Sequence, residues 1–453
     1  MRYLTVLVTL LLAVQGVRAD NVAQAIWCSG NKTLYFAYES QVSPNSTYDG
    51  QTVTKVYSVS LDTYTGLPAW NESTEDVDTK ATKVVFRDNF KTVTPKSCQQ
   101  WFQNFWELTE IVGLEYLNTS EVENMDFMFD GCEKLEKLDV SNFDVTKVAS
   151  ALSMFKNCSS LKTIYCNKVW TISNNASMFY NCTSLKGGIA YVESKADGDL
   201  ATPKGGYFTA RLTINAENLN QYVDYYGDIT LNCSLYKDGH WNTLCLPFDV
   251  TNFSNTVLKD ATVKYFYRTD FDDKDNTLTL NFTEMELPIE ACTPFIVKWA
   301  DSGSKDAVTS HQFYGVTIKT DGSKAIVKTD IIHFKSCFEA TPFPLGKEDN
   351  TMLYLGSDDN LYYPGADGVT IAAFHAYFQL QKGYSIATSG SAKIRNFVMN
   401  FDGEDDGTAT GIASLPEDTK DAATWYTLDG RRLSGQPTQK GIYINNGKKF
   451  MIK

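Results

Sequence analysis

A short pattern of apolar residues recurs four times between Trp101 and Leu185. Each copy has two large apolar residues side by side, a further apolar residue three positions on, and a leucine three positions beyond that. The copies begin 27, 26 and 24 residues apart, a period typical of stacked repeats. We predict a repeat core made of Phe102, Leu108, Met128, Phe129, Cys132, Leu135, Leu138, Met154, Phe155, Cys158, Leu161, Met178, Phe179, Cys182 and Leu185.

The spacing inside one copy predicts its local structure. The apolar residues from Met128 to Leu135 would lie on one face of a short helical turn. The following residues, with Leu138 and Val140 alternating with polar neighbours, indicate a short strand. One helix and one strand of this size cannot bury their apolar faces alone, so the copies must stack on each other. The expected fold class of this segment is therefore a short solenoid of α+β repeats.

The run from Met128 to Val148 resembles the BspA-type leucine-rich repeat of bacterial surface proteins, in particular those of Bacteroidetes. The first copy differs by carrying Phe105 where the others have cysteine, and the fourth loses its strand pattern after Leu185. Both are expected to be end caps, because terminal repeats must present a different outer face. The resemblance implies adhesion or protein recognition at the cell surface rather than catalysis.

Residues 1–19 have the features of a secretory signal peptide. Arg2 precedes an apolar run from Leu4 to Val14, and Val17-Arg18-Ala19 forms the cleavage site. The run is too short to span a bilayer. The alternative to a signal peptide is that this apolar segment is a core element. We therefore expect a secreted chain, extracellular or on the outer cell surface, without a transmembrane span after cleavage.

The remaining chain divides by composition into five further parts. Residues 20–95 are expected to form a β-rich N-terminal cap, 96–210 the repeats, 211–400 an all-β domain resembling a sandwich, 401–423 an acidic linker and 424–453 a small C-terminal β unit. Asp358-Asp359-Asn360 and Asn446-Gly447 are the expected turns of two hairpins. The last part resembles the C-terminal sorting domain of type IX secretion, on the strength of Leu-Asp-Gly-Arg-Arg and Gly-Ile-Tyr-Ile.

Charge and cysteine usage exclude some partners. The net charge is −13 and no basic run occurs, so nucleic acid is not an expected partner. Three of the ten cysteines occupy the repeat core, where a thiol acts as a small apolar group. We favour a reduced ladder over disulfides, which would require matching side-chain directions. The sequence contains no Cys-x-x-Cys motif, so a zinc site is not expected.

Residues that could carry catalysis are scattered. His240, His311, His333 and His375 stand singly, and Cys245 and Cys292 lie in apolar, strand-like surroundings. The acidic segment from Asp270 to Asn276 resembles a calcium-binding loop, but it lacks the glycine and the closing glutamate that such a loop requires. We predict no catalytic residue, no metal and no cofactor, and treat a hydrolase as the weakest hypothesis.

Outward-facing strand residues of the repeats are the candidate protein-binding surface, since alternate residues of a strand share one face. They are Glu110, Lys137, Asp139, Ser141, Thr163, Tyr165, Asn167 and Tyr191. The expected partner is an extracellular host protein or a surface protein of a neighbouring cell. The alternative is a carbohydrate-binding surface protein that uses the 211–400 domain, with Tyr362 and Tyr363 stacking on a glycan.

Overall fold

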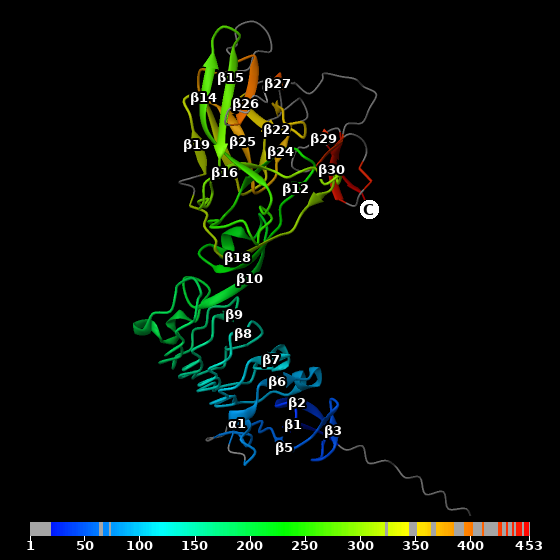
Figure 1. Ribbon diagram of the computed structural model, residues 1–453, viewed down its shortest axis with the longest axis vertical. Helices are drawn as coiled ribbons and strands as arrows, with labels where there is room; N and C mark the ends of the chain where they lie inside the picture. The colour runs from blue at the N-terminus through cyan, green and yellow to red at the C-terminus, as the bar shows by residue number, and fades with distance from the viewer. Residues whose placement is uncertain are drawn as a thin grey trace, which may run out of the picture. The chain divides into compact units, whose positions relative to one another are not determined.

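The computed structural model describes residues 20–62, 67–71, 74–321, 325–343, 351–363, 368–384 and 394–401, and short stretches beyond these at 410–411, 425–427, 432–433, 437–438, 441–445 and 448–452. The predicted signal peptide and most of the predicted linker lie outside the described residues. The chain forms two compact units (Figure 1). The first comprises residues up to 165 with 170–186 and 190–201, and the second comprises 166–169, 187–189 and the residues from 202 onward.

A five-stranded sheet begins the first unit, in the order β5 (Lys55–Ser58), β1 (Asn21–Cys28), β2 (Thr33–Ser40), β6 (Lys83–Phe86) and β7 (Glu110–Val112). Strands β5, β1 and β2 are antiparallel neighbours, and β2, β6 and β7 run parallel. Its aromatic core packs onto the first repeat, since the Phe36 ring stacks on Trp101 at 5.4 Å between centroids. Smaller elements are β3 (Thr47–Tyr48), β4 (Gln51–Thr52), α1 (Val77–Lys80), η1 (Asp88–Thr92) and η2 (Leu114–Tyr116).

The predicted solenoid of α+β leucine-rich repeats is wrong. The described part of the chain is rich in strands arranged as several small sheets, and its only α-helix is α1, which precedes the repeats. The repeats contain turns, the three-residue strands β8 (Lys137–Asp139) and β9 (Thr163–Tyr165), and the 3-10 turns η3 (Glu193–Lys195) and η4 (Gly198–Leu200) at their end. The segment from Met128 to Leu135, predicted as a helical turn, contains no helix.

Backbone hydrogen bonds explain why no helix forms there. Phe127 and Gly131 have left-handed backbone angles, with φ of 56° and 80°, which a right-handed helix excludes. The amide of Phe129 donates to the carbonyl of Met154 in the next copy at 2.8 Å, whereas the amide of Met128 donates locally to Met125. Alternate amides thus bond to the neighbouring copy. A helix would use all of these amides within itself and leave none for stacking.

Side chains inside the repeats form two columns. The rings of Phe102, Phe129, Phe155 and Phe179 stack in sequence, with centroids 5.4, 5.7 and 5.6 Å apart. Each repeat cysteine donates its thiol hydrogen to a carbonyl of the preceding copy, as Cys158 does to Phe129 at 3.1 Å. The fifteen residues predicted for the repeat core are each at most 3% exposed. All ten cysteines are buried, and none of them forms a disulfide.

The second unit contains two sheets that share one core (Figure 1). One has the order β13 (Asn242–Cys245), β16 (Pro294–Lys298), β14 (Thr262–Asp272), β15 (Thr277–Glu284), β26 (Asn396–Phe401) and β27 (Thr410–Gly411). The other has the order β19 (Ile326–Lys328), β20 (Ile332–Cys337), β25 (His375–Leu380), β22 (Met352–Leu355) and β23 (Leu361–Tyr362). Aromatic rings of both sheets meet in this core, where Phe266 of the first sheet lies 5.8 Å from Phe378 of the second.

A second core in this unit lies beneath β10 (Phe208–Ile214), β11 (Tyr226–Leu231) and β18 (His311–Thr317), with β10 and β11 parallel and β18 antiparallel to β11. The short elements are η5 (Leu219–Tyr222), β12 (Leu235–Tyr236), β17 (Ala307–Val308), β21 (Thr341–Pro342) and β24 (Thr370–Ile371). A small sheet near the C-terminus contains β28 (Trp425–Thr427), β29 (Arg432–Leu433), β30 (Gly441–Asn445) and β31 (Lys448–Ile452). The two predicted hairpins are confirmed as β22–β23 and β30–β31.

Candidate functional site

The strands β8 and β9 bring four of the predicted surface residues together. They run parallel, with Lys137 opposite Thr163 and Asp139 opposite Tyr165. Leu138 and Ile164, between these pairs, are 3% and 0% exposed and hold the strands to the repeat core. The four outward residues share one face because side chains alternate along a strand. We call Lys137, Asp139, Thr163 and Tyr165 the β8–β9 patch.

Glu110 lies in a different sheet from this patch. Its strand β7 pairs with β6, and its carboxylate forms an ion pair with Lys83 at 2.8 Å. Val112, in the same strand, is 39% exposed, whereas Leu114 is buried in η2. The predicted binding surface therefore does not continue as a single hydrogen-bonded sheet from β7 to β8.

The other predicted surface residues have local structural contacts. The Asn167 amide side chain donates to the Arg211 carbonyl at 3.1 Å and accepts from the Arg211 amide at 2.8 Å, within the second unit. The Tyr191 hydroxyl accepts a hydrogen bond from the Asn181 amide at 2.9 Å. The Ser141 amide donates to Asp139 Oδ1 at 3.0 Å, which orients that carboxylate at the edge of the patch.

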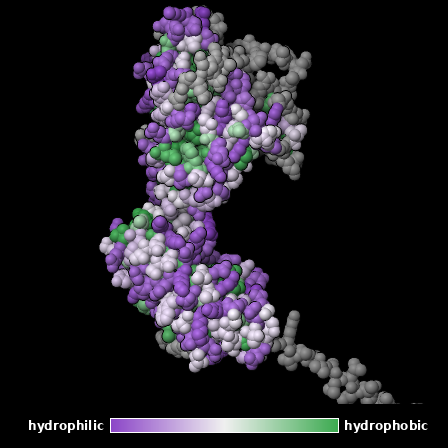
Figure 2. All heavy atoms as spheres, in the orientation of Figure 1, coloured by the Kyte–Doolittle hydropathy of each residue, from purple (hydrophilic) through white to green (hydrophobic). Residues whose placement is uncertain are grey.

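Ion pairs between successive copies were missed by sequence reasoning. They join Glu107 to Lys134, Glu121 to Lys147 and Glu136 to Lys162, at 2.7, 2.7 and 2.9 Å. The partners lie about one repeat apart in the chain. This recurring spacing of glutamate and lysine is the sequence signal that could have predicted the pairs. The side chains of these pairs are exposed, and ion pairs of this kind contribute little stability. On the face drawn in Figure 2, hydrophilic and intermediate residues cover most of the first unit.

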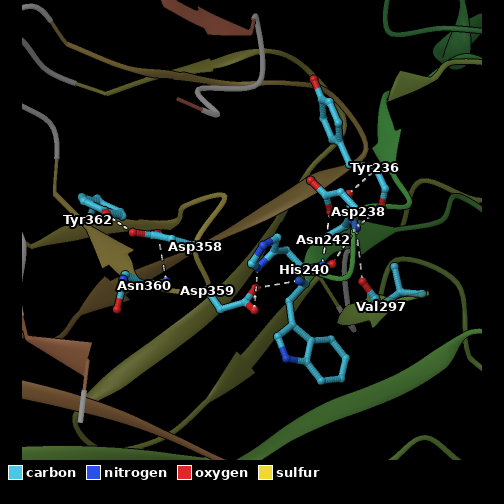
Figure 3. Close-up of polar contacts among 10 residues, drawn as sticks. Tyr236, Asp238, His240, Asn242, Val297, Asp358, Asp359, Asn360 and Tyr362 are labelled. Carbon is cyan, nitrogen blue, oxygen red and sulfur yellow. Dashed lines mark hydrogen bonds and ion pairs between the residues drawn. The ribbon is translucent and has the colours of Figure 1, made fainter. Parts of the chain in front are cut away.

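A polar cluster in the second unit was also missed, because it joins distant parts of the chain (Figure 3). His240 lies in the loop before β13, and Asp359 lies in the β22–β23 turn. Asp359 Oδ2 is 3.1 Å from His240 Nδ1, and its Oδ1 accepts the Trp241 amide at 2.7 Å. The cluster therefore ties a loop of one sheet to a turn of the other.

The neighbouring turn residues have a comparable structural role. The Tyr362 hydroxyl donates to Asp358 Oδ2 at 2.5 Å, and the Asn360 amide donates to Asp358 Oδ1 at 3.3 Å. Burial opposes ionisation of Asp358, but these hydrogen bonds outweigh it and lower the pKa of the carboxyl group. The Tyr362 ring also stacks on Tyr354 at 5.8 Å, and Tyr362 and Tyr363 are only partly exposed. This geometry disfavours both rings as the predicted flat platform for a glycan.

Two of the other histidines contact backbone carbonyls. His375 Nδ1 lies 2.8 Å from the Thr243 carbonyl, and His311 Nε2 lies 3.0 Å from the Cys233 carbonyl. Burial lowers the pKa of His311, since it disfavours the charged ring. Burial also lowers the pKa of His333. These contacts orient the rings within strands rather than toward a reacting group.

The cysteines considered as nucleophiles are held in the same way. Cys245 donates its thiol hydrogen to the His375 carbonyl at 3.1 Å, and burial raises its pKa well above the ordinary value. Burial raises the pKa of Cys292 to about 11. A thiol must ionise to act as a nucleophile, so both are poorly suited to attack at neutral pH.

The acidic segment from Asp270 to Asn276, which resembles a calcium loop, forms a turn stabilised by its aspartates. Asp272 Oδ1 accepts the Lys274 amide at 2.8 Å, and Asp275 Oδ1 accepts the Thr277 amide at 3.0 Å. These bonds close the connection between β14 and β15. Within the described ranges, no group of three or more histidine, cysteine, aspartate or glutamate side chains is placed to hold a metal ion.

Comparisons with known proteins found a partial match to one family model. The family model of a Mycoplasma protein of unknown function, DUF285, matches residues 71–193, which include all four repeats. No curated protein and no solved structure shows significant similarity to the chain. In the part of the chain that the structure describes, no helix has the length and apolar character needed to cross a membrane.

Proposed function

We propose that the chain is an exported protein that binds another protein through the β8–β9 patch. The observation that carries this proposal is the register of the two strands, which sets Lys137 beside Thr163 and Asp139 beside Tyr165 on one face. The face combines a cation, an anion, a hydroxyl group and an aromatic ring. Such a mixture suits a protein partner, because tyrosine can anchor an interface while flanking charges select the partner.

Preorganisation favours binding by this surface. The residues behind the patch, Leu138 and Ile164, are buried, and the Val140 amide donates to the Tyr165 carbonyl at 2.9 Å immediately beside it. A surface fixed before binding loses less conformational entropy when a partner docks. The patch is small, so we infer that neighbouring residues of the first unit enlarge the interface beyond these four.

Export is the second part of the proposal. It is supported by the signal-peptide pattern in residues 1–19 and by the resemblance of residues 128–148 to repeats of bacterial surface proteins. The partner is then an extracellular protein or a surface protein of a neighbouring cell. The buried, carbonyl-bonded thiols and histidines described above favour a binding role over a catalytic one.

The test measures binding of the mature chain, residues 20–453, to immobilised extracellular-matrix proteins. The Asp139→Lys and Tyr165→Ala double variant should weaken saturable binding at least about tenfold, because it reverses one charge and removes the aromatic anchor. Glu133→Lys with Tyr180→Ala is the matched control, since Glu133 and Tyr180 are exposed repeat residues outside the patch. Thermal melting establishes that both variants fold.

Equal binding by the parent and the folded patch variant would overturn the assignment of the site. Loss of binding in the control variant alone would move the interface to another face of the repeats. If no protein of the panel binds the parent saturably, the proposed class of partner is wrong.

A further inference from the structure

A hollow of about 380 Å³ lies within the second unit, and none of its lining residues belongs to the polar cluster of Figure 3. Its wall includes Leu219 and Asn220 from η5, Thr320 just after β18, and Phe338 and Glu339 just after β20. Binding pockets for small molecules commonly have volumes of about 300–1,000 Å³. The hollow therefore matches a ligand at the small end of this range.

One part of the wall is apolar. Leu219 is buried, and Phe338 is half-buried with its ring edge-on to Phe374 at 6.2 Å between centroids. This packing restrains the Phe338 side chain within the wall. An aromatic and an aliphatic side chain together can cover the apolar face of a small ring.

The other part of the wall is polar, and its side chains are open to hydrogen bonding by a ligand. The side chains of Asn220, Thr320 and Glu339 make no hydrogen bond to another residue of the described ranges. Together they present a carboxylate, an amide and a hydroxyl group. Lys319, the cation next to Thr320 in the chain, has its ammonium group 2.6 Å from Asp249. The wall thus offers strong acceptors and carries a negative rather than a positive charge.

From this arrangement we propose that the hollow binds a neutral sugar residue. A sugar ring has C–H groups that pack on aromatic and aliphatic surfaces and hydroxyl groups that donate to carboxylates and amides. Glu339 accepts hydroxyl hydrogens, and Asn220 both donates and accepts. An anionic ligand would be repelled by Glu339, and no second carboxylate lines the hollow to favour a dication. This site is independent of the β8–β9 patch.

The test titrates the mature chain with the methyl glycosides of glucose, galactose, mannose and N-acetylglucosamine. Saturation-transfer NMR detects binding, and calorimetry gives a Kd expected on the order of 1 mM for so small a ligand. Glu339→Gln should weaken binding about tenfold or more, because it replaces a charged acceptor with a weaker neutral one. Asn220→Ala should have a similar effect, because it removes both a donor and an acceptor. Both residues are exposed, so these variants should fold.

Glu286→Gln is the matched control, since Glu286 is an exposed glutamate of the same unit that does not line the hollow. It should bind as the parent does. The proposal is overturned if none of the four glycosides binds saturably, or if the folded Glu339→Gln and Asn220→Ala variants bind with unchanged Kd. Binding of ethanolamine in place of the glycosides, lost in Glu339→Gln, would show that the hollow selects an amine and would equally overturn it.

Discussion

Replacing Gly131 by alanine distinguishes the observed repeat backbone from the helical turn that the apolar spacing predicts. In a helix, Gly131→Ala would stabilise the protein by about 0.5–1 kcal/mol, because alanine is the better helix former. In the structure, Gly131 has a φ of 80°, in the left-handed region that disfavours a Cβ atom. The two backbones therefore predict stability changes of opposite sign.

The magnitude follows from two costs and one gain. The left-handed conformation destabilises an alanine by about 1–2 kcal/mol. Alanine also lowers the conformational entropy of the unfolded chain, which stabilises the fold by about 0.4–1 kcal/mol. A Cβ atom at Gly131 would also lie 3.1 Å from Asn104 Oδ1 and 3.2 Å from Asn104 Cα, closer than ordinary contact. With this crowding we expect a net destabilisation of about 1–3 kcal/mol.

Differential scanning calorimetry of the mature chain measures this effect, with roughly 2–4 °C expected per kcal/mol for a unit of this size. Gly50→Ala serves as the control. Gly50 has a φ of 75°, and no atom lies within 4 Å of the place that a Cβ would take, so this variant reports the backbone cost alone. Gly131→Ala should lower the transition temperature more than Gly50→Ala does. A raised or unchanged transition temperature for Gly131→Ala would refute the left-handed backbone and restore the helical turn.

Two further predictions concern the repeat core. Leu138→Asp places a charge at a position that is 3% exposed. It should destabilise the first unit by about 3–5 kcal/mol, measured by denaturant titration. An unchanged midpoint would contradict the assigned strand register. Burial raises the pKa of Cys158 and Cys182 well above the ordinary 9.0, so the unfolded chain loses these protons first as pH rises. Stability should therefore fall above pH 9, less steeply in Cys158→Ala, and a midpoint that is constant or rises between about pH 8 and 10 would contradict this.

The apolar spacing predicted which repeat residues meet but not the backbone that carries them. Phe129 and Phe155 occupy equivalent positions in the sequence, and their rings stack at 5.7 Å. A helical turn and a series of left- and right-handed turns can both direct residues at this spacing inward. The choice depends on hydrogen bonds to the next copy, such as that from Phe129 to Met154, which a single copy does not reveal.

The repeat cysteines illustrate a related limit. Their recurrence indicated a small buried residue, and the burial of Cys132 agrees with that interpretation. The structure adds a reason for sulfur, because the Cys132 thiol donates to the Phe102 carbonyl of the preceding copy at 3.3 Å. An alanine would fill less space and provide no donor for this carbonyl.

Contacts over long sequence distances account for the rest of what sequence reasoning missed. The Asp358-Asp359-Asn360 turn was predicted from residue types, but its contact with His240 spans 119 residues. The wall of the hollow likewise combines η5 with segments after β18 and β20. No local pattern encodes such meetings, because they arise from the way the sheets pack.

By itself the sequence determined the existence and register of four repeats, the residues that each contributes to the core and the positions of two hairpin turns, because these depend on spacing and on local residue preferences. Only the tertiary structure decided that the repeats use turns rather than helices, that Glu110 lies in a different sheet from the β8–β9 patch, and that a hollow opens beside Glu339. The physical reason is that these features depend on hydrogen bonds and packing between segments distant in the chain, which become definite only when the whole core assembles.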